Sequence, residues 1–397
     1  MRPTGRLHLG HYFGALQNWL KLQEEYDCFF FIADWHALTT HYEDTSSIAE
    51  NTLQVAMDWL SVGLDPEKAT LFIQSDVLEH AELHVLLSMT TPLSWLERVP
   101  TYKEQIENLK DRDLGTYGFL GYPLLQSADI VIYDADLVPV GEDQAPHVEL
   151  TREVVRRFNG HFALAISDAL FTHEAYATFM GIRKDLSFTD IPPLPETMGP
   201  HLAGVLRKRI LESGFENALA LAKSLKKYVR MQTVLTEPTY LLTETPRLPG
   251  TDGRRMAKSY GNAIWLSDPL DEIRTKVRDM MTDPQRQRRT DPGRPEVCPV
   301  FAWHKLFSPP DVIAWSDQGC RTAGIGCVEC KAKMADNLVK WIEPIQARRK
   351  EFEKNPESVW SILDAGGKQA HRAAKKTMKR VRNAIFKWDE ARKAGGN

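Results

Sequence analysis

Residues 3–11 read Pro-Thr-Gly-Arg-Leu-His-Leu-Gly-His and lead directly into an amphipathic stretch. Gly10 has no side chain, so a nucleotide can lie against the backbone there. A helix that begins near His11 would present free N–H groups and a positive dipole end to phosphates. His8 and His11 bracket the glycine and can donate hydrogen bonds to phosphate oxygens as charge builds on them. A surface turn also fits this first motif, so a nucleotide site is predicted only together with a second phosphate-binding segment.

Short apolar runs that are typical of buried parallel strands follow the first motif. They lie at residues 28–33, 70–74 and 137–140. Stretches with apolar residues at helical spacing come before and between them, at residues 12–23 and 48–60. The repeated order of strand, helix and strand predicts an α/β fold with a Rossmann-like open parallel sheet. Ligands of such sheets bind at the carboxyl ends of the strands.

The rest of the chain is predominantly helical. The composition shifts predict four parts: a Rossmann-like catalytic domain at residues 1–160, a helical insertion at 161–233, a continuation of the first domain at 234–268, and a helical C-terminal domain at 269–397. Separate helices are expected in the last part, at residues 331–343, 344–354 and 368–393.

Residues 253–262 form a second motif, which reads Gly-Arg-Arg-Met-Ala-Lys-Ser-Tyr-Gly-Asn. A glycine-containing loop that carries cations suits a triphosphate. Lys258 can neutralise charge that develops on a leaving pyrophosphate, and Ser259 can donate a hydrogen bond to it. An ordinary basic loop is the alternative for this segment taken alone.

The two motifs, in this order and about 240 residues apart, resemble the HIGH and KMSKS motifs of the class I aminoacyl-tRNA synthetases. The HIGH motif corresponds to residues 8–11, and the KMSKS motif to residues 255–259. Within that class the chain is most similar to the tryptophan-specific enzymes. The segments that carry this likeness are residues 121–133, 138–152 and 242–250. The resemblance implies that L-tryptophan is joined to ATP and then to tRNA(Trp).

The resemblance also implies roles for individual residues. His8, His11, Lys258 and Ser259 would be catalytic, with Mg²⁺ carried on the phosphates of ATP. Tryptophan would be held by Asp129, Tyr122 and Gln144. Asp129 would accept the indole N–H, and a substrate that lacks this group would leave a buried carboxylate unpaired. The expected ATP-binding residues are Arg2, Pro3, Thr4, Gly10, His11, Gly141, Glu142, Asp143, Leu248, Arg255, Met256, Ala257, Lys258 and Ser259.

Several positions depart from the pattern of the family. Arg255 replaces a lysine of the KMSKS motif and keeps its charge with a different geometry, and Ala257 replaces a serine and loses a hydroxyl. Gln126 stands where relatives often have an apolar residue near the indole. The family also has a buried strand ahead of the first motif. Because Met1 lies so close to His8, we expect a sheet that lacks this strand and weak or absent adenylation in this form.

The charge of the chain is unevenly distributed. The net charge is −3, but residues 331–397 hold 17 Lys and Arg against 8 Asp and Glu. A C-terminal region of this kind favours a polyanion, and tRNA is the partner that the resemblance implies. No apolar run approaches the roughly 20 residues of a membrane helix, and no secretory signal is visible, so we expect a cytoplasmic protein without a membrane partner.

Four of the five cysteines lie close together in the sequence. Cys298, Cys320, Cys327 and Cys330 fall within a short segment, whereas Cys28 sits alone in an apolar run. This spacing suits a tetrahedral Zn²⁺ or a [4Fe–4S] cluster. A subset of the tryptophan enzymes has a very similar arrangement and holds a [4Fe–4S] cluster, which makes iron–sulfur the first expectation. Zinc and uncoordinated thiols are the alternatives.

Two other functions share much of this pattern. A tyrosine-specific synthetase has the same fold and both motifs. A non-catalytic RNA-binding or redox-sensing protein on a synthetase scaffold would explain the altered second motif and the cysteines. The retained His8, His11, Lys258 and Ser259 favour an enzyme. The resemblance further implies a homodimer.

Overall fold

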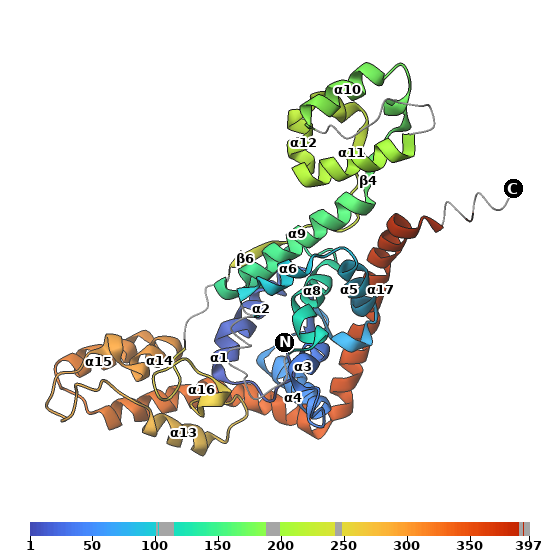
Figure 1. The fold of residues 1–397 in the computed structure, drawn as a ribbon. Helices are drawn as coiled ribbons and strands as arrows, with labels where there is room; N and C mark the ends of the chain where they lie inside the picture. Colours follow the sequence, from blue (N-terminus) through green and yellow to red (C-terminus); the bar gives the residue numbers. More distant parts are fainter. Residues whose placement is uncertain (101, 103–114, 188–198, 243–247, 389–391, 393–397) are drawn as a thin grey trace. The chain divides into compact units, whose positions relative to one another are not determined.

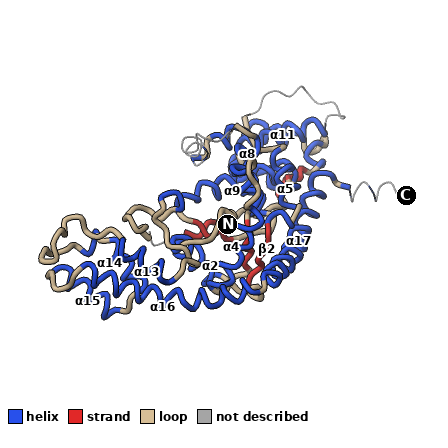
Figure 2. The backbone as a smooth tube through the Cα atoms, turned by 90° about the horizontal axis from the view of Figure 1, so that it is seen from below, coloured by secondary structure: helices blue, strands red, loops and turns tan. Residues whose placement is uncertain are grey.

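The computed structural model describes residues 1–100, 102, 115–187, 199–242, 248–388 and 392 (Figure 1). Contacts between residues divide it into two compact units, which are described one at a time. The first unit is Met1–Val77 with Leu242–Ala370, and the second is Leu78–Leu241 with His371–Asn397. Helices make up most of both units, and the strands are short (Figure 2).

Two parallel strands organise the first unit. β1 (Cys28–Ile32) pairs with β2 (Ala69–Ile73), in register from Cys28 opposite Ala69 to Ile32 opposite Ile73. The connection contains the helices α3 (Asp34–His41) and α4 (Ile48–Val62), as a parallel crossover requires. Two of the expected strands and the Rossmann-like arrangement are therefore confirmed.

The chain enters the first unit beside β1. The Met1 ammonium donates to the Phe31 carbonyl at 2.6 Å, and Ala33 N donates to the Met1 carbonyl at 2.8 Å. The first motif then opens a helical stretch, formed by α1 (Leu9–His11), a π-helical turn (Tyr12–Leu16) and α2 (Gln17–Leu22). The expected helix is confirmed, and its π-helical turn is of a kind often found next to functional sites.

The C-terminal half of the first unit is helical, as the sequence predicts. Its helices are α13 (Leu270–Asp279), α14 (Pro299–Phe307), α15 (Pro310–Arg321), α16 (Cys327–Lys354) and the part of α17 (Pro356–Phe386) that ends at Ala370. α13 and α14 both pack on α16 (Figure 1). The expectation of two helices that meet at residue 344 is wrong, because α16 runs through Pro344 without a break. Buried side chains on both sides of the proline, Leu338, Ile342 and Ile345, hold the helix together against the lost backbone hydrogen bond.

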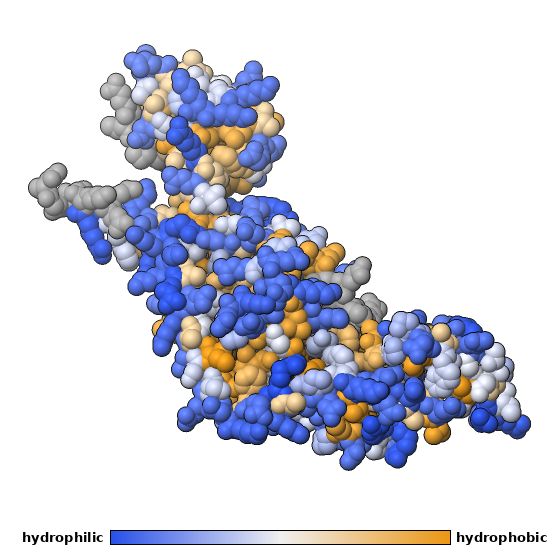
Figure 3. Space-filling view, turned by 180° about the vertical axis from the view of Figure 1, so that it is seen from behind, coloured by the Kyte–Doolittle hydropathy of each residue, from blue (hydrophilic) through white to orange (hydrophobic). Residues whose placement is uncertain are grey.

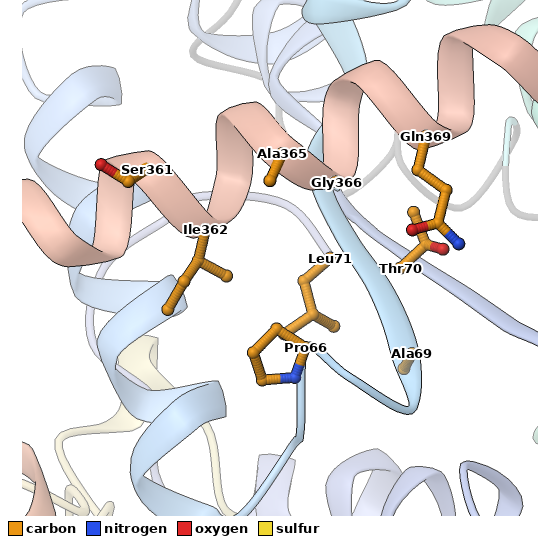
Figure 4. A pocket seen from close by; sticks show the side chains of 9 residues that line it. All are labelled: Pro66, Ala69, Thr70, Leu71, Ser361, Ile362, Ala365, Gly366 and Gln369. Carbon is orange, nitrogen blue, oxygen red and sulfur yellow. The ribbon is translucent and has the colours of Figure 1, made fainter.

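The helix α17 lies directly against strand β2 within the first unit. A Cβ atom on Gly366 would come within 1.9 Å of the Leu71 carbonyl oxygen, so only glycine permits this approach. Beside the contact is a cavity of about 240 Å³ lined by Pro66, Ala69, Thr70, Leu71, Ser361, Ile362, Ala365, Gly366 and Gln369 (Figure 4). The lining is mainly apolar and carries no charged side chain, so we interpret the cavity as a packing gap between α17 and β2.

One hydrophobic core joins both motifs to the C-terminal helices of the first unit. Leu7 and Leu9 of the first motif share it with Met256 of the second motif and with Leu338 and Ile342 of α16. Residues that are hundreds of positions apart in the sequence are thus fixed by the same buried cluster.

The second unit contains the third expected strand. β3 (Leu137–Val140) pairs with β6 (Thr239–Leu242), and β4 (Leu164–Ile166) pairs antiparallel with β5 (Val229–Met231). Its helices are α5 (Glu79–Ser88), α6 (Leu93–Glu97), α8 (Tyr117–Val131), α9 (Ala145–Phe162), α10 (Tyr176–Asp185), α11 (Gly199–Ser213) and α12 (Phe215–Leu221). α8 packs against α5 on one side and α9 on the other.

The segment predicted as a helical insertion has a core of its own. Phe179, Leu206 and Leu225 belong to this core, and the short β4–β5 pair closes it. Polar side chains cover most of the molecular face drawn in Figure 3, with apolar ones visible between them. Among the described residues no helix is long and apolar enough to cross a bilayer.

Candidate functional site

The first motif is held in place by backbone hydrogen bonds to the segment that follows the second motif. Leu9 N donates to the Ile264 carbonyl at 3.0 Å, and Leu266 N donates to the Leu7 carbonyl at 2.9 Å. These bonds flank an antiparallel bridge between His8 and Trp265. The two motifs, far apart in sequence, are therefore neighbours within the first unit.

The rings of the two histidines of the first motif are in contact, tilted by 33° to each other. Their ring centroids are 3.7 Å apart, and His8 N donates to His11 Nδ1 at 3.1 Å. Burial, followed by the charge of Arg255, lowers the pKa of His8 to about 4, and burial followed by His8 lowers that of His11 to about 3. Both rings are neutral at physiological pH, so each can offer an N–H to a phosphate oxygen without carrying a charge.

Gly10 fits tightly between the two motifs. A Cβ atom at this position would lie 2.9 Å from the His8 ring and 3.5 Å from the Met256 side chain. That a nucleotide lies against the backbone at Gly10 stays a prediction. Any side chain here would have to displace the histidine ring.

Lys258 connects the second motif to the first. Its ammonium donates to the Thr4 carbonyl at 2.8 Å, although the side chain is otherwise exposed. Ser259 follows in a short helical turn that ends at Gly261, whose φ of 63° suits glycine. Lys258 and the first motif thus lie on the same side of the unit, which is the arrangement that a shared triphosphate requires.

Asn262 fixes the shape of the second motif, a role that sequence reasoning missed. Its Oδ1 accepts from Ala257 N at 2.9 Å, and its Nδ2 donates to the Asp252 carboxylate at 2.7 Å and to the Arg255 carbonyl at 3.1 Å. The side chain is buried, so the bonds are shielded from water. The sequence itself shows only an asparagine directly after Gly261, which does not reveal these bonds.

The other expected nucleotide residues fall into both units. Thr4 N donates to the Arg2 carbonyl at 3.0 Å, so the start of the first motif is a tight turn, with Pro3 buried beside it. Leu248 is buried in the same core as Met256. Gly141 and Glu142 lie in the second unit, where β3 ends; Asp143 follows in the next helical turn, and its side chain lies outside the described part.

Asp129 lies on α8 in the second unit and is almost fully buried. Its Oδ1 is 2.6 Å from His80 Nδ1 on α5, and His80 Nε2 is 2.6 Å from the Tyr133 hydroxyl. Tyr122 precedes Asp129 by two turns of the same helix, and its ring centroid is 5.8 Å from that of His147. Sequence reasoning named Asp129 and Tyr122 but missed His80 as the partner of the carboxylate.

Gln144 stands at the start of α9, the helix that also carries His147. Tyr122 and Asp129 lie on α8 and Gln144 directly precedes α9, and these two helices pack on each other. All three residues expected to bind the amino acid belong to the second unit.

The four cysteines of the C-terminal half form one cysteine site. Cys298 precedes α14, Cys320 lies near the end of α15, and Cys327 and Cys330 lie in the first turn of α16. Burial raises the pKa of Cys330 to about 11; the Ser316 hydroxyl opposes this, and the other three thiols add to it. The thiols are therefore near enough to repel one another when ionised.

Hydrogen-bond donors surround these thiols. Three backbone N–H groups, of Phe301, Val300 and Asp283, oppose the burial that raises the pKa of Cys298. The buried Arg286 guanidinium lies 3.7 Å from Cys320 Sγ. A guanidinium and backbone donors directed at sulfur stabilise thiolates rather than thiols. Within the described part, however, no three His, Cys, Asp or Glu side chains converge on one ion position.

Comparison with known proteins shows which families and structures this chain is similar to. Residues 1–184 and 208–343 match the sequence model of the class I tRNA synthetases for tryptophan and tyrosine. The tryptophan–tRNA ligase of Ralstonia nicotianae is 48% identical and aligns with 97% of this chain and 96% of its own length. That of Thermotoga maritima is 42% identical, with 97% of each chain aligned. The structure is similar to Campylobacter jejuni tryptophanyl-tRNA synthetase complexed with ADP and tryptophan, with a TM-score of 0.74, 26% identity and coverage of 97% and 98%.

Proposed function

Because the chain belongs to the class I tRNA synthetases for tryptophan and tyrosine, and its relatives along nearly the whole length are tryptophan–tRNA ligases, we infer that it joins L-tryptophan to ATP and then to tRNA(Trp). The observation that carries this within the structure is the contact of Lys258 with Thr4, which brings both motifs to one place. Tryptophan-dependent exchange of pyrophosphate into ATP tests it. Exchange that depends on tyrosine instead would refute it.

The chemistry assigned to the two motifs needs no covalent protein nucleophile. The tryptophan carboxylate attacks the α-phosphorus in line, and the bond to pyrophosphate breaks. Lys258 balances charge on the departing pyrophosphate, and Ser259 donates a hydrogen bond to it. Neutral His8 and His11 would each donate one ring N–H to a phosphate oxygen. Mg²⁺ on the phosphates would add to this stabilisation.

The remaining nucleotide residues keep the roles that the resemblance implies. In the first unit the nucleotide would lie on the turn of Arg2, Pro3 and Thr4 and against the backbone at Gly10 in α1, and Leu248 would contact adenine through its backbone. Arg255, Met256 and Ala257 would complete the second motif around the phosphates. In the second unit Gly141, Glu142 and Asp143 would line the ribose.

The amino acid is assigned to the polar group on α8. Asp129 would accept the indole N–H, while Tyr122 and Gln144 would hold the amino-acid head group. The contact with His80 supports this assignment, because it fixes the orientation of a buried carboxylate. Replacing Asp129 by Asn should raise the KM for tryptophan more than the KM for ATP.

The cysteine site is assigned to a [4Fe–4S] cluster held by Cys298, Cys320, Cys327 and Cys330. The fit rests on Arg286 and on the backbone donors to Cys298, since four thiolates on a cluster carry net negative charge. Zn²⁺ and uncoordinated thiols stay the alternatives to the cluster. The cluster would stabilise the fold locally and add a redox-active centre.

Metal analysis distinguishes the two groups. Visible absorbance together with iron and sulfide supports the cluster. A colourless protein with one bound zinc contradicts it.

Assembly and location follow the family in this proposal. Leu78, Val85 and Met89 are exposed on one face of α5 and suit a homodimer contact. The excess positive charge of residues 331–397 suits tRNA, and a cytoplasmic location fits this substrate. The division at residues 160, 233 and 268 remains our proposal for the domains, with the separate core of the insertion in its support. Sedimentation at several concentrations tests the dimer.

A further inference from the structure

A buried ion pair links the C-terminal helix α16 to α4 in the first unit. Arg349 on α16 contacts Asp58 on α4 through Nη1 and Oδ1, and the two side chains are only 4% and 1% exposed. The guanidinium also contacts the Gln54 side chain and donates from Nε to Glu353 at 3.0 Å. A charged pair this deeply buried is weak evidence for stability, because apolar side chains can fill the same space.

The second carboxylate oxygen of Asp58 binds the backbone of the first motif. Asp58 Oδ2 accepts the backbone N–H of Leu7 at 2.8 Å, directly ahead of His8 in the chain. The Leu7 carbonyl accepts from Leu266 N on its other side. Leu7 is therefore held at both of its backbone polar groups. An apolar residue in place of Asp58 would fill the space but leave this N–H without an acceptor.

We propose that Asp58 and Arg349 are positioning residues for the nucleotide site: Arg349 keeps the Asp58 carboxylate ionised and oriented, and Asp58 fixes the first motif through Leu7. Neither residue is placed against the substrate, so both act through the backbone ahead of His8. The inference rests on the proposed ATP site at the first motif. It assigns the C-terminal helix a part in setting the geometry of that site.

Two double variants isolate the acceptor from the ion pair. Asp58→Asn with Arg349→Met removes both charges and keeps an oxygen that can accept from Leu7. Asp58→Leu with Arg349→Met removes the charges and the acceptor together. Both avoid an uncompensated buried charge, so both are expected to fold. We expect the KM for ATP in pyrophosphate exchange to be about ten-fold higher for the leucine pair than for the asparagine pair, with equal KM for tryptophan.

A stability control separates positioning from mere packing. Leu338→Ala removes a fully buried side chain on the same helix and should lower the melting temperature while leaving the KM for ATP unchanged. Equal KM for ATP in the two double variants would overturn the proposal. Absence of tryptophan-dependent exchange in the unaltered protein would instead overturn the proposed function, so the two failures are distinguishable.

Discussion

The first motif and the cysteine site share one unit and one core, but they are completed in different ways. Burial lowers the pKa of His8 and His11, so both rings are neutral, and they pack against each other within the protein. At the cysteine site burial raises the pKa of Cys298, Cys320 and Cys330, and thiolates formed there repel one another. We therefore propose that the first site takes an anion, and the proposed metal at the second site would hold its thiolates together.

Because of this difference, substitutions at the two sites should affect different properties of the protein. A change in either motif should act on the ATP-dependent step while leaving stability almost unchanged. A change in a thiol should remove the metal and lower stability while leaving the affinity for ATP almost unchanged. A substitution that moved both properties together would show that the two sites are coupled through their common core.

Lys258→Ala should have the largest effect on catalysis. Removing a cation directed at charge that develops in the transition state costs about 10²–10³-fold in rate, as loss of one such donor does elsewhere. Pyrophosphate exchange measures it. Lys68→Ala, which removes an exposed lysine paired with Glu24, is the control and should leave the rate unchanged. A loss of less than about three-fold for Lys258→Ala would contradict its assigned role.

Cys330→Ser should empty the cysteine site. We expect loss of iron and of visible absorbance, with a melting temperature lowered by about 5 °C or more, because a bound metal stabilises the folded state. The KM for ATP should stay within about two-fold. Cys28→Ser, in strand β1, serves as the control and should keep the full iron content. A rise in the KM for ATP that follows the loss of iron would break the comparison between the two sites.

Gly10→Ala tests the tight packing of the first motif. Its Cβ would meet the His8 ring at 2.9 Å and turn it from its place, and we expect about a ten-fold loss in kcat/KM for ATP. Gly14→Ala is a matched control on the same helical stretch, because a Cβ there meets no atom within 4 Å. An unchanged rate for Gly10→Ala would show that the ring position has no role in ATP use.

The sequence alone was sufficient to predict those parts of the fold that are set by local sequence patterns. The apolar runs at β1, β2 and β3 predicted strands, and the spacing of His8, Gly10 and His11 predicted a turn that leads into a helix. The break expected at residue 344 was wrong, because packing along α16 outweighs a local signal against helix.

The partners of the site residues could not be predicted from local patterns. Nothing near Asp58 in the sequence points to Arg349, which lies 291 positions away, and nothing near Asp129 points to His80. Such pairs are set by the tertiary fold, and an aspartate inside a helical pattern is usually solvated. The KMSKS likeness drew attention to Lys258, but the buried bonds of Asn262 became visible only when the loop was folded.

The pH dependence of ATP use offers the smallest and most discriminating effect. Burial raises the pKa of Asp58 from 3.8 to about 6, opposed by Arg349, by the Leu7 N–H and by Arg6. Below about pH 6 the carboxylate takes up a proton and loses both its ion pair and its strength as an acceptor. If ATP binds only the ionised form, the KM for ATP should rise about four-fold between pH 7 and pH 5.5. His8 and His11 remain neutral over this range, so they do not account for such a rise.

The contribution of Asp58 to folding stability should change with pH in the direction opposite to the affinity for ATP. Between pH 3.8 and about 6 the folded protein holds a proton on Asp58 that the unfolded chain releases. Asp58 therefore stabilises the folded state at low pH, and this contribution to the free energy of unfolding is lost as the pH rises through about 6. Acid should therefore weaken ATP binding while the Asp58 contribution to folding grows. The KM for ATP and the free energy of unfolding should be measured against pH in the unaltered protein and in the double variant Asp58→Asn with Arg349→Met. The difference between the two proteins gives the effect of the Asp58 carboxyl on ATP binding and its effect on folding. Parallel loss of ATP affinity and stability on acidification, with the same slope in both proteins, would mean that general unfolding rather than the Asp58 carboxylate limits the site.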